Sequence, residues 1–254
     1  MYDCPVNHPD LPQLFDPTVP DNPALWAVFE GRHAGRAVVD DVEHPAHCVV
    51  RTEAVLTFSS RRVKPTFLSE AIAHVGKFGA IWLVWPEADA TPAGLPEADR
   101  ITQRLEFYDC DVGSQALVDL RARLPEGCEM CAIDRLLLER CEWREDMIFF
   151  CGSVDNFLLN GMGLCLMRGG EILVEAYVSS FGGKQAEIGA VTRADYRGKG
   201  YAPIACAYLI QACHERGYQA YWSCEADNTA SIRVAEKLGF YQRKSYQVLE
   251  YHGL

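Results

Sequence analysis

The feature that most constrains this 254-residue chain is the alternation of strand and helix patterns in its second half. Glycine turns separate the segments, and a long helical apolar stripe ends at Gly217. Strands are predicted at 163–168, 171–181, 185–192, 219–224 and 240–251, and helices at 201–216 and 228–238. Hairpins that lead into a strand–helix–strand–helix succession predict an α/β fold with a mixed sheet.

The first half carries a weaker pattern of the same kind. Strands are predicted at 36–40, 48–59, 80–85 and 105–111, and helices from Pro23 and at 67–78 and 114–123. The proline-rich first twenty residues are expected to form no regular element. Between the halves, 133–141 is predicted as a strand and 152–160 as a short helix. A boundary at Pro125-Glu-Gly127 predicts a smaller α/β domain at 1–125 and a second domain at 126–254.

The turn before the long helix carries the chemistry. It reads Arg197-Gly-Lys-Gly-Tyr-Ala202 and follows a strand directly. Neither a GxxxxGK[ST] loop nor a GxGxxG fingerprint is present, which argues against a nucleoside triphosphate or a dinucleotide as the ligand. Successive backbone N–H groups in such a turn, together with the positive end of a helix, are suited to another phosphate group.

Composition excludes several other classes of function. The net charge of −11 argues against a nucleic-acid partner, because no basic stripe is present to replace counterions. No apolar run is long enough to span a membrane, and no signal peptide is recognisable, so a cytoplasmic protein is expected. The eleven cysteines are then expected to be reduced thiols. Cys128 and Cys131 form a CxxC without a second ligand pair, so we predict no metal site and rank a zinc or redox protein last.

Two motifs make the second half resemble the GNAT superfamily of acyl-CoA-dependent N-acetyltransferases. One is the turn at residues 197–202, and the other is Asn228 followed by Glu236-Lys-Leu-Gly-Phe240, one helix and one strand later. The resemblance covers residues 163–254. The stretch "NPALWAVFEGRHAGRAVVDD" also looks like a GNAT subgroup in which a divergent N-terminal domain precedes the catalytic one. The family fold is a mixed central sheet with two strands that splay apart, flanked by helices.

The resemblance implies acetyl-CoA as co-substrate, without a metal. Strand 187–192 is expected to carry a bulge and to diverge from strand 221–224, so that the pantetheine arm lies between them. Arg193 and Lys199 are candidates to reach the nucleotide phosphates. The residues implied in cofactor binding are Ala190, Val191, Thr192, Arg197, Gly198, Lys199, Gly200, Tyr201, Ala202, Asn228 and Ser231.

The same resemblance suggests how an amine could be acylated. Glu187 matches the position of a catalytic carboxylate and could take a proton from the amine, directly or through water. The tyrosine that many members use to protonate the leaving thiolate is Ala235 here. Ser231, Tyr241 and Tyr246 are substitute candidates. A primary amine of a small molecule or peptide is the expected acceptor and a homodimer is allowed, while an acyl-CoA-binding module without turnover is the alternative.

Overall fold

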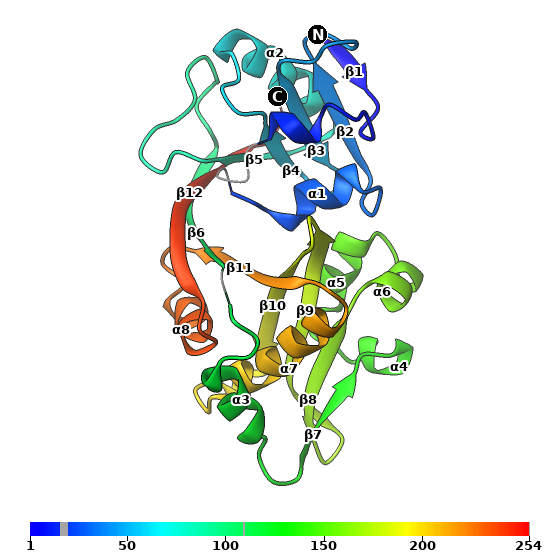
Figure 1. The fold of residues 1–254 in the computed structure, drawn as a ribbon, viewed down its shortest axis with the longest axis vertical. Helices are drawn as coiled ribbons and strands as arrows, with labels where there is room; N and C mark the ends of the chain where they lie inside the picture. Colours follow the sequence, from blue (N-terminus) through cyan, green and yellow to red (C-terminus); the bar gives the residue numbers. More distant parts are fainter. Residues whose placement is uncertain (16–19, 109, 254) are drawn as a thin grey trace. The chain divides into compact units, whose positions relative to one another are not determined.

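The computed structural model describes residues 1–15, 20–108 and 110–253 (Figure 1). The chain forms two compact units. Unit 1 comprises Met1–Glu106, Glu225–Asp227 and Lys244–Leu254, and unit 2 comprises Phe107–Cys224 and Asn228–Arg243. This division differs from the boundary expected at 125/126, because the last strand of the chain pairs with a strand of the N-terminal half.

Unit 1 contains a mixed sheet. Its elements are β1 (Tyr2–Cys4), η1 (Pro12–Leu14), α1 (Pro23–Phe29), β2 (Gly35–Val39), β3 (Cys48–Thr52), β4 (Leu56–Ser59), α2 (Pro65–Val75), η2 (Gly76–Phe78), β5 (Ile81–Trp85) and most of β6 (Arg100–Tyr108) and β12 (Tyr241–Tyr251). The strand order is β1-β2-β3-β4-β5-β12. Strands β1 to β4 are antiparallel, β4 and β5 are parallel, and β12 is antiparallel to β5.

Alternating side chains divide the core of unit 1 into two layers. Val39 and Val50 lie in a cluster with Leu25 and Val28 of α1. Val38, one position away, lies in a second cluster with the apolar stripe of α2. Since neighbouring strand residues point to opposite faces, α1 covers one face of the sheet and α2 the other.

Unit 2 also contains a mixed sheet, which includes the predicted hairpins. Its elements are α3 (Gln115–Ala122), β7 (Cys128–Ala132), α4 (Arg135–Leu138), α5 (Arg144–Cys151), α6 (Val154–Asn160), β8 (Gly163–Arg168), β9 (Glu171–Gly182), β10 (Gln185–Thr192), η3 (Ala194–Tyr196), α7 (Tyr201–Glu215), β11 (Gln219–Glu225) and α8 (Thr229–Lys237). The strand order is β11-β10-β9-β8-β7. Neighbouring strands from β7 to β10 are antiparallel, and β10 and β11 are parallel. Helix α7 packs on β8, β9 and β10 (Figure 1).

The two units share one topology. In each, four consecutive strands pair as antiparallel neighbours, one helix follows, and the next strand pairs parallel to the fourth. The helix is α2 between β4 and β5 in unit 1, and α7 between β10 and β11 in unit 2. The mixed α/β architecture expected from the sequence is therefore confirmed, and it occurs twice.

The main error of the sequence prediction lies before β8. Residues 133–141 are not a strand: Asp134 caps the short helix α4 by accepting a hydrogen bond from Leu137 N at 2.7 Å. The neighbouring strand is β7 instead, which includes the CxxC pair and pairs with β8. Strand β1 was also missed; it lies before the first proline of the N-terminal stretch. Asp109, inside the predicted strand 105–111, and residues 16–19 lie outside the described residues.

Candidate active site

Strands β10 and β11 are neighbours only at one end. Their parallel pairing covers three positions, from Gln185 with Gln219 to Glu187 with Tyr221. A bulge follows between Glu187 and Ile188. From there to Thr192, the described residues of β10 pair with β9 alone. The expected bulge is confirmed, and the backbone pairing of the two strands ends after Glu187 as expected. We call the region beside Ala190, Val191 and Thr192, where β10 no longer pairs with β11, the slot.

The turn at the start of α7 is shaped to receive an anion. Gly198 and Gly200 have φ of +75° and +79°, a region that other residues rarely adopt. A Cβ at either position would meet no atom within 4 Å, so the space above the turn is open. No side chain caps α7, and within the described chain no hydrogen bond involves the N–H groups of residues 198–200. Free donors at a helix N-terminus suit a pyrophosphate group.

Cationic side chains surround this turn, each held by a neighbour. Arg197 Nε donates to the Thr192 carbonyl at 3.1 Å, Lys199 Nζ to the Asp195 carbonyl at 2.9 Å, and Arg168 Nη2 to the Tyr201 hydroxyl at 3.3 Å. All three residues are exposed, so they can contribute positive potential at this turn.

Arg193 has partners within the protein, and its predicted contact with the phosphates stays a prediction. It forms ion pairs with Glu142 at 3.5 Å and with the buried Glu175 at 2.9 Å. Glu175 also accepts the backbone N–H groups of Glu142 and Trp143 at 2.7 and 3.0 Å. These bonds hold the segment that precedes α5 against strand β9, next to the slot.

Glu187 lies where the two strands begin to separate. Its Oε1 accepts a hydrogen bond from the Ser223 hydroxyl of β11 at 2.6 Å, and its Oε2 is 3.2 Å from the Ser179 hydroxyl of β9. The carboxylate is half-buried. Two hydroxyl donors hold it in one orientation at the end of the slot, as a base acting on a bound amine requires.

An aromatic group that the sequence prediction missed lies beside Glu187. Tyr177 of β9 is paired with Gly189, and its ring lies over that glycine. Trp143 packs edge-on against Tyr177, with ring centroids 6.1 Å apart. Burial raises the pKa of Tyr177, and the charges of Asp146, Glu187 and Glu175 raise it further. The sequence signal was the glycine at 189, inside an otherwise β-prone strand.

The residues predicted on α8 have structural partners. Asn228 Oδ1 accepts from Ser231 N at 3.0 Å and so caps the helix. The Ser231 hydroxyl accepts a hydrogen bond from Trp222 Nε1 at 3.0 Å. Ala235 is fully buried. The Asn228 amide nitrogen is not used by the cap, so the predicted cofactor contact stays a prediction for it.

Tyr246 lies in unit 1, in a different unit from Glu187 and Ser231. Its side chain is 2% exposed, and its hydroxyl oxygen accepts a hydrogen bond from Arg104 Nε at 3.0 Å. Tyr241, the other candidate near the end of the chain, is exposed. The structure thus does not gather the three proton-donor candidates within one unit.

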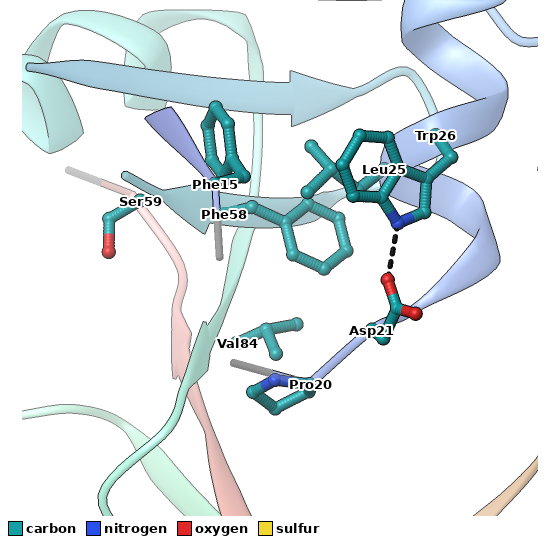
Figure 2. A pocket seen from close by; sticks show the side chains of 8 residues that line it. All are labelled: Phe15, Pro20, Asp21, Leu25, Trp26, Phe58, Ser59 and Val84. Atoms are coloured by element: carbon teal, nitrogen blue, oxygen red, sulfur yellow. Dashed lines mark hydrogen bonds between the residues drawn. The ribbon is translucent and has the colours of Figure 1, made fainter. Parts of the chain in front are cut away.

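Among the described residues of unit 1, the parallel pair of strands shows no comparable separation. Strand β4 pairs with β5 at Leu56, Thr57 and Phe58, three of its four residues, so no comparable part of the strand is left open. Beside this pair lies an apolar pocket lined by Phe15, Pro20, Asp21, Leu25, Trp26, Phe58, Ser59 and Val84 (Figure 2). Asp21, one of these lining residues, accepts a hydrogen bond from Trp26 Nε1 at 2.5 Å (Figure 2).

Two other kinds of site were sought in the described ranges 1–15, 20–108 and 110–253. No group of three or more His, Cys, Asp or Glu side chains there is arranged to hold a metal ion. No helix in those ranges is both long and apolar enough to cross a bilayer. All eleven cysteines are free thiols.

Comparison with known proteins agrees with this geometry. The sequence model of the family described as GNAT acetyltransferase matches residues 13–249, across both units. The uncharacterised N-acetyltransferase YdfB of Bacillus subtilis strain 168 is 28% identical over 128 residues, which cover 50% of this chain and only about half (49%) of that protein.

Solved structures show the same fold over nearly the whole chain. A GCN5-related N-acetyltransferase-like protein from Streptococcus suis 89/1591 has a TM-score of 0.66 and 27% identity, covering 96% of this chain and 95% of its own. A tandem GNAT protein from the clavulanic acid biosynthesis pathway has a TM-score of 0.61 and 12% identity, covering 87% of this chain and 83% of its own. The chain therefore belongs to the GNAT acetyltransferase family and is an acyltransferase.

Proposed function

We propose that the protein transfers an acetyl, or another short acyl, group from coenzyme A to a primary amine of a small molecule or peptide. The observation that carries this proposal is the separation of β10 from β11 after Glu187, with a glycine turn and the free N-terminus of α7 beyond it. Acetyl-CoA supplies the activated acyl group. The slot residues Ala190, Val191 and Thr192 hold its arm, and the turn 197–202 holds its pyrophosphate.

Glu187 is the proposed base. An amine near its reference pKa of about 10 is mostly protonated at neutral pH, and a proton must leave the nitrogen. Glu187 accepts that proton first and leaves a neutral amine, whose nitrogen then bonds to the carbonyl carbon. As the carbon–sulfur bond breaks, the nitrogen loses a second proton to solvent and becomes the amide nitrogen. Coenzyme A leaves as a thiolate and takes a proton from solvent, because Ala235 offers no donor. The carboxylates near Tyr177, which are Asp146, Glu187 and Glu175, suit an acceptor that arrives as a cation.

The test combines binding and turnover. We expect acetyl-CoA to raise the melting temperature of the full chain, since a ligand at 100 times its Kd stabilises by about 2.7 kcal/mol. We expect thiol release from acetyl-CoA with at least one member of a panel of polyamines, amino sugars and lysine peptides. Stabilisation without thiol release on any amine would favour an acyl-CoA-binding module. No stabilisation would reject the proposed cofactor site.

A further inference from the structure

Tyr177 is nearly buried, but its hydroxyl has no partner among the described residues. The side chain is 4% exposed. None of the described residues forms a hydrogen bond with its hydroxyl. The hydroxyl oxygen is not fully enclosed, so it is reachable from outside the core. A hydroxyl that has no partner in the protein and can be reached from outside is free to donate a hydrogen bond to a ligand.

The ring of Tyr177 extends from β9 over β10. Tyr177 is paired with Gly189, and a Cβ at Gly189 would lie 3.1 Å from Tyr177 Cζ and 3.4 Å from its hydroxyl oxygen. The end of the ring therefore lies over β10 at the one position of that strand where no side chain blocks it. Beyond β10 on this side is the slot, which begins after Glu187.

The surroundings of Tyr177 keep its hydroxyl protonated. Burial and the nearby carboxylates raise the pKa of Tyr177 above its usual value near 10, so the hydroxyl is neutral at physiological pH. Such a group is a poor acid for protonating a thiolate. It is well suited to donating a hydrogen bond to a developing negative charge while keeping its proton. Trp143, edge-on against the ring at 6.1 Å, limits its movement.

We propose that Tyr177 donates a hydrogen bond to the acyl carbonyl oxygen of acetyl-CoA and stabilises the negative charge that develops there during transfer. This inference rests on the proposed function. It gives the site a hydrogen-bond donor on β9. On α8, the position where many family members place a tyrosine is Ala235 in this chain.

The first test reads the carbonyl directly. Acetyl-CoA labelled with ¹³C at the carbonyl carbon is bound to the full chain, and its carbonyl stretch is measured by infrared difference spectroscopy. We expect a lower wavenumber in the wild-type complex than in free acetyl-CoA, and a return toward the free value in Tyr177→Phe. The matched control is Tyr208→Phe, whose hydroxyl donates to the Arg121 carbonyl on α3 at 3.1 Å. An identical band in wild type and Tyr177→Phe would overturn the inference.

The second test uses turnover on an amine found in the panel. We expect Tyr177→Phe to lower kcat about 10²-fold, the cost of losing one such donor, with the affinity for acetyl-CoA and the shape of the pH profile unchanged. A higher KM for the amine alone would overturn the inference, because Tyr177 would then bind the acceptor. If the wild-type protein binds no acetyl-CoA, both the proposed function and this inference fail. When this inference alone fails, the wild-type protein still binds acetyl-CoA, so the two results can be told apart.

A second variant, Gly189→Ala, displaces the Tyr177 ring without changing the tyrosine itself. The Cβ of Gly189→Ala would lie 3.1 Å from Tyr177 Cζ, which forces the ring to shift. We expect the carbonyl band of the Gly189→Ala complex to move in the same direction as that of Tyr177→Phe. In the Tyr177→Phe background, Gly189→Ala should leave the band unchanged. A band unaffected by Gly189→Ala in the wild-type background would count against the inference.

Discussion

The Ser223 hydroxyl donates to Glu187 Oε1 at 2.6 Å, at the point where the backbones of β11 and β10 stop pairing. A side-chain hydrogen bond thus continues the contact between the two strands for one step after their backbone hydrogen bonds end. It also fixes the carboxylate in the opening. The geometry of the separation and the orientation of the proposed base are therefore set by the same residue pair.

Replacing Glu187 by Gln should abolish turnover while keeping the cofactor. The amide preserves size and can still contact Ser223, but it cannot accept a proton, and loss of a general base lowers kcat by about 10²- to 10⁴-fold. The measurement is kcat against pH, with acetyl-CoA affinity by calorimetry. A variant with the wild-type rate at every pH would remove Glu187 as the base.

Replacing Gly200 by Glu should abolish acetyl-CoA binding. The new carboxylate would enter the space above the turn and face the pyrophosphate, and juxtaposed like charges cost several kcal/mol, which is about 100-fold or more in Kd. The matched control is Gly217→Glu, at the other end of α7. Gly217 has a similar φ of +84° and equally open surroundings. Equal weakening by both variants, or unchanged affinity in Gly200→Glu, would contradict the assigned phosphate position.

One molecule of acetyl-CoA should bind per chain. Both units have the same strand topology. Within the described residues, however, β10 extends beyond its pairing with β11, whereas β4 remains paired with β5 through Phe58. The turn before α2 also lacks glycines, since it reads Ser60-Arg-Arg-Val-Lys64. Isothermal titration calorimetry measures the stoichiometry. Two equivalents per chain would show that unit 1 also forms a site.

Stability should fall in alkaline solution partly because of Cys206. Burial raises the pKa of this thiol to about 12, whereas an unfolded thiol ionises near 8.5. The stabilisation that comes from keeping this buried thiol neutral is complete below the pKa of the unfolded thiol. It is lost as the pH rises toward the pKa of the folded thiol, at about 1.4 kcal/mol of unfolding free energy per pH unit. Between pH 7 and 10, Cys206→Ala should therefore lose about 2 kcal/mol less than wild type in urea unfolding with a reductant present. Identical pH dependence in the two proteins would contradict this.

Local signals explain what could be predicted of the fold. Strand β10 was predicted with its observed bounds because glycine turns and polar residues limit an apolar run. Helix α7 was predicted within one residue of its C-terminal end because Gly217 ends it in the left-handed region. Helix α1 begins where Asn22 and Pro23 indicated, with Asn22 Oδ1 accepting from Ala24 N at 2.8 Å.

Long-range pairing explains what could not be predicted. No local pattern shows that β12 pairs with β5, more than 150 positions earlier, so the sequence division at 125/126 could not anticipate the observed units. The same holds for Tyr177. Its sequence neighbours predict only a strand, and its role depends on Gly189, which lies opposite it through the register of β9 and β10. The glycine turn at 198–200, by contrast, was recognisable because its positive φ values demand glycine locally.

Because β12 belongs to the sheet of unit 1, this sheet can be completed only at the end of the synthesis of the chain. Residues 1–106 leave the ribosome first, yet β5 obtains its antiparallel neighbour only when residues 247–251 have been made. At a synthesis rate of roughly 5–20 residues per second, that edge stays unpaired for about 10 seconds or more. Apolar strand edges attract other chains during such an interval. This N-terminal unit is therefore expected to need chaperone protection until the last strand arrives, and it should not be expressed as a fragment ending at residue 125.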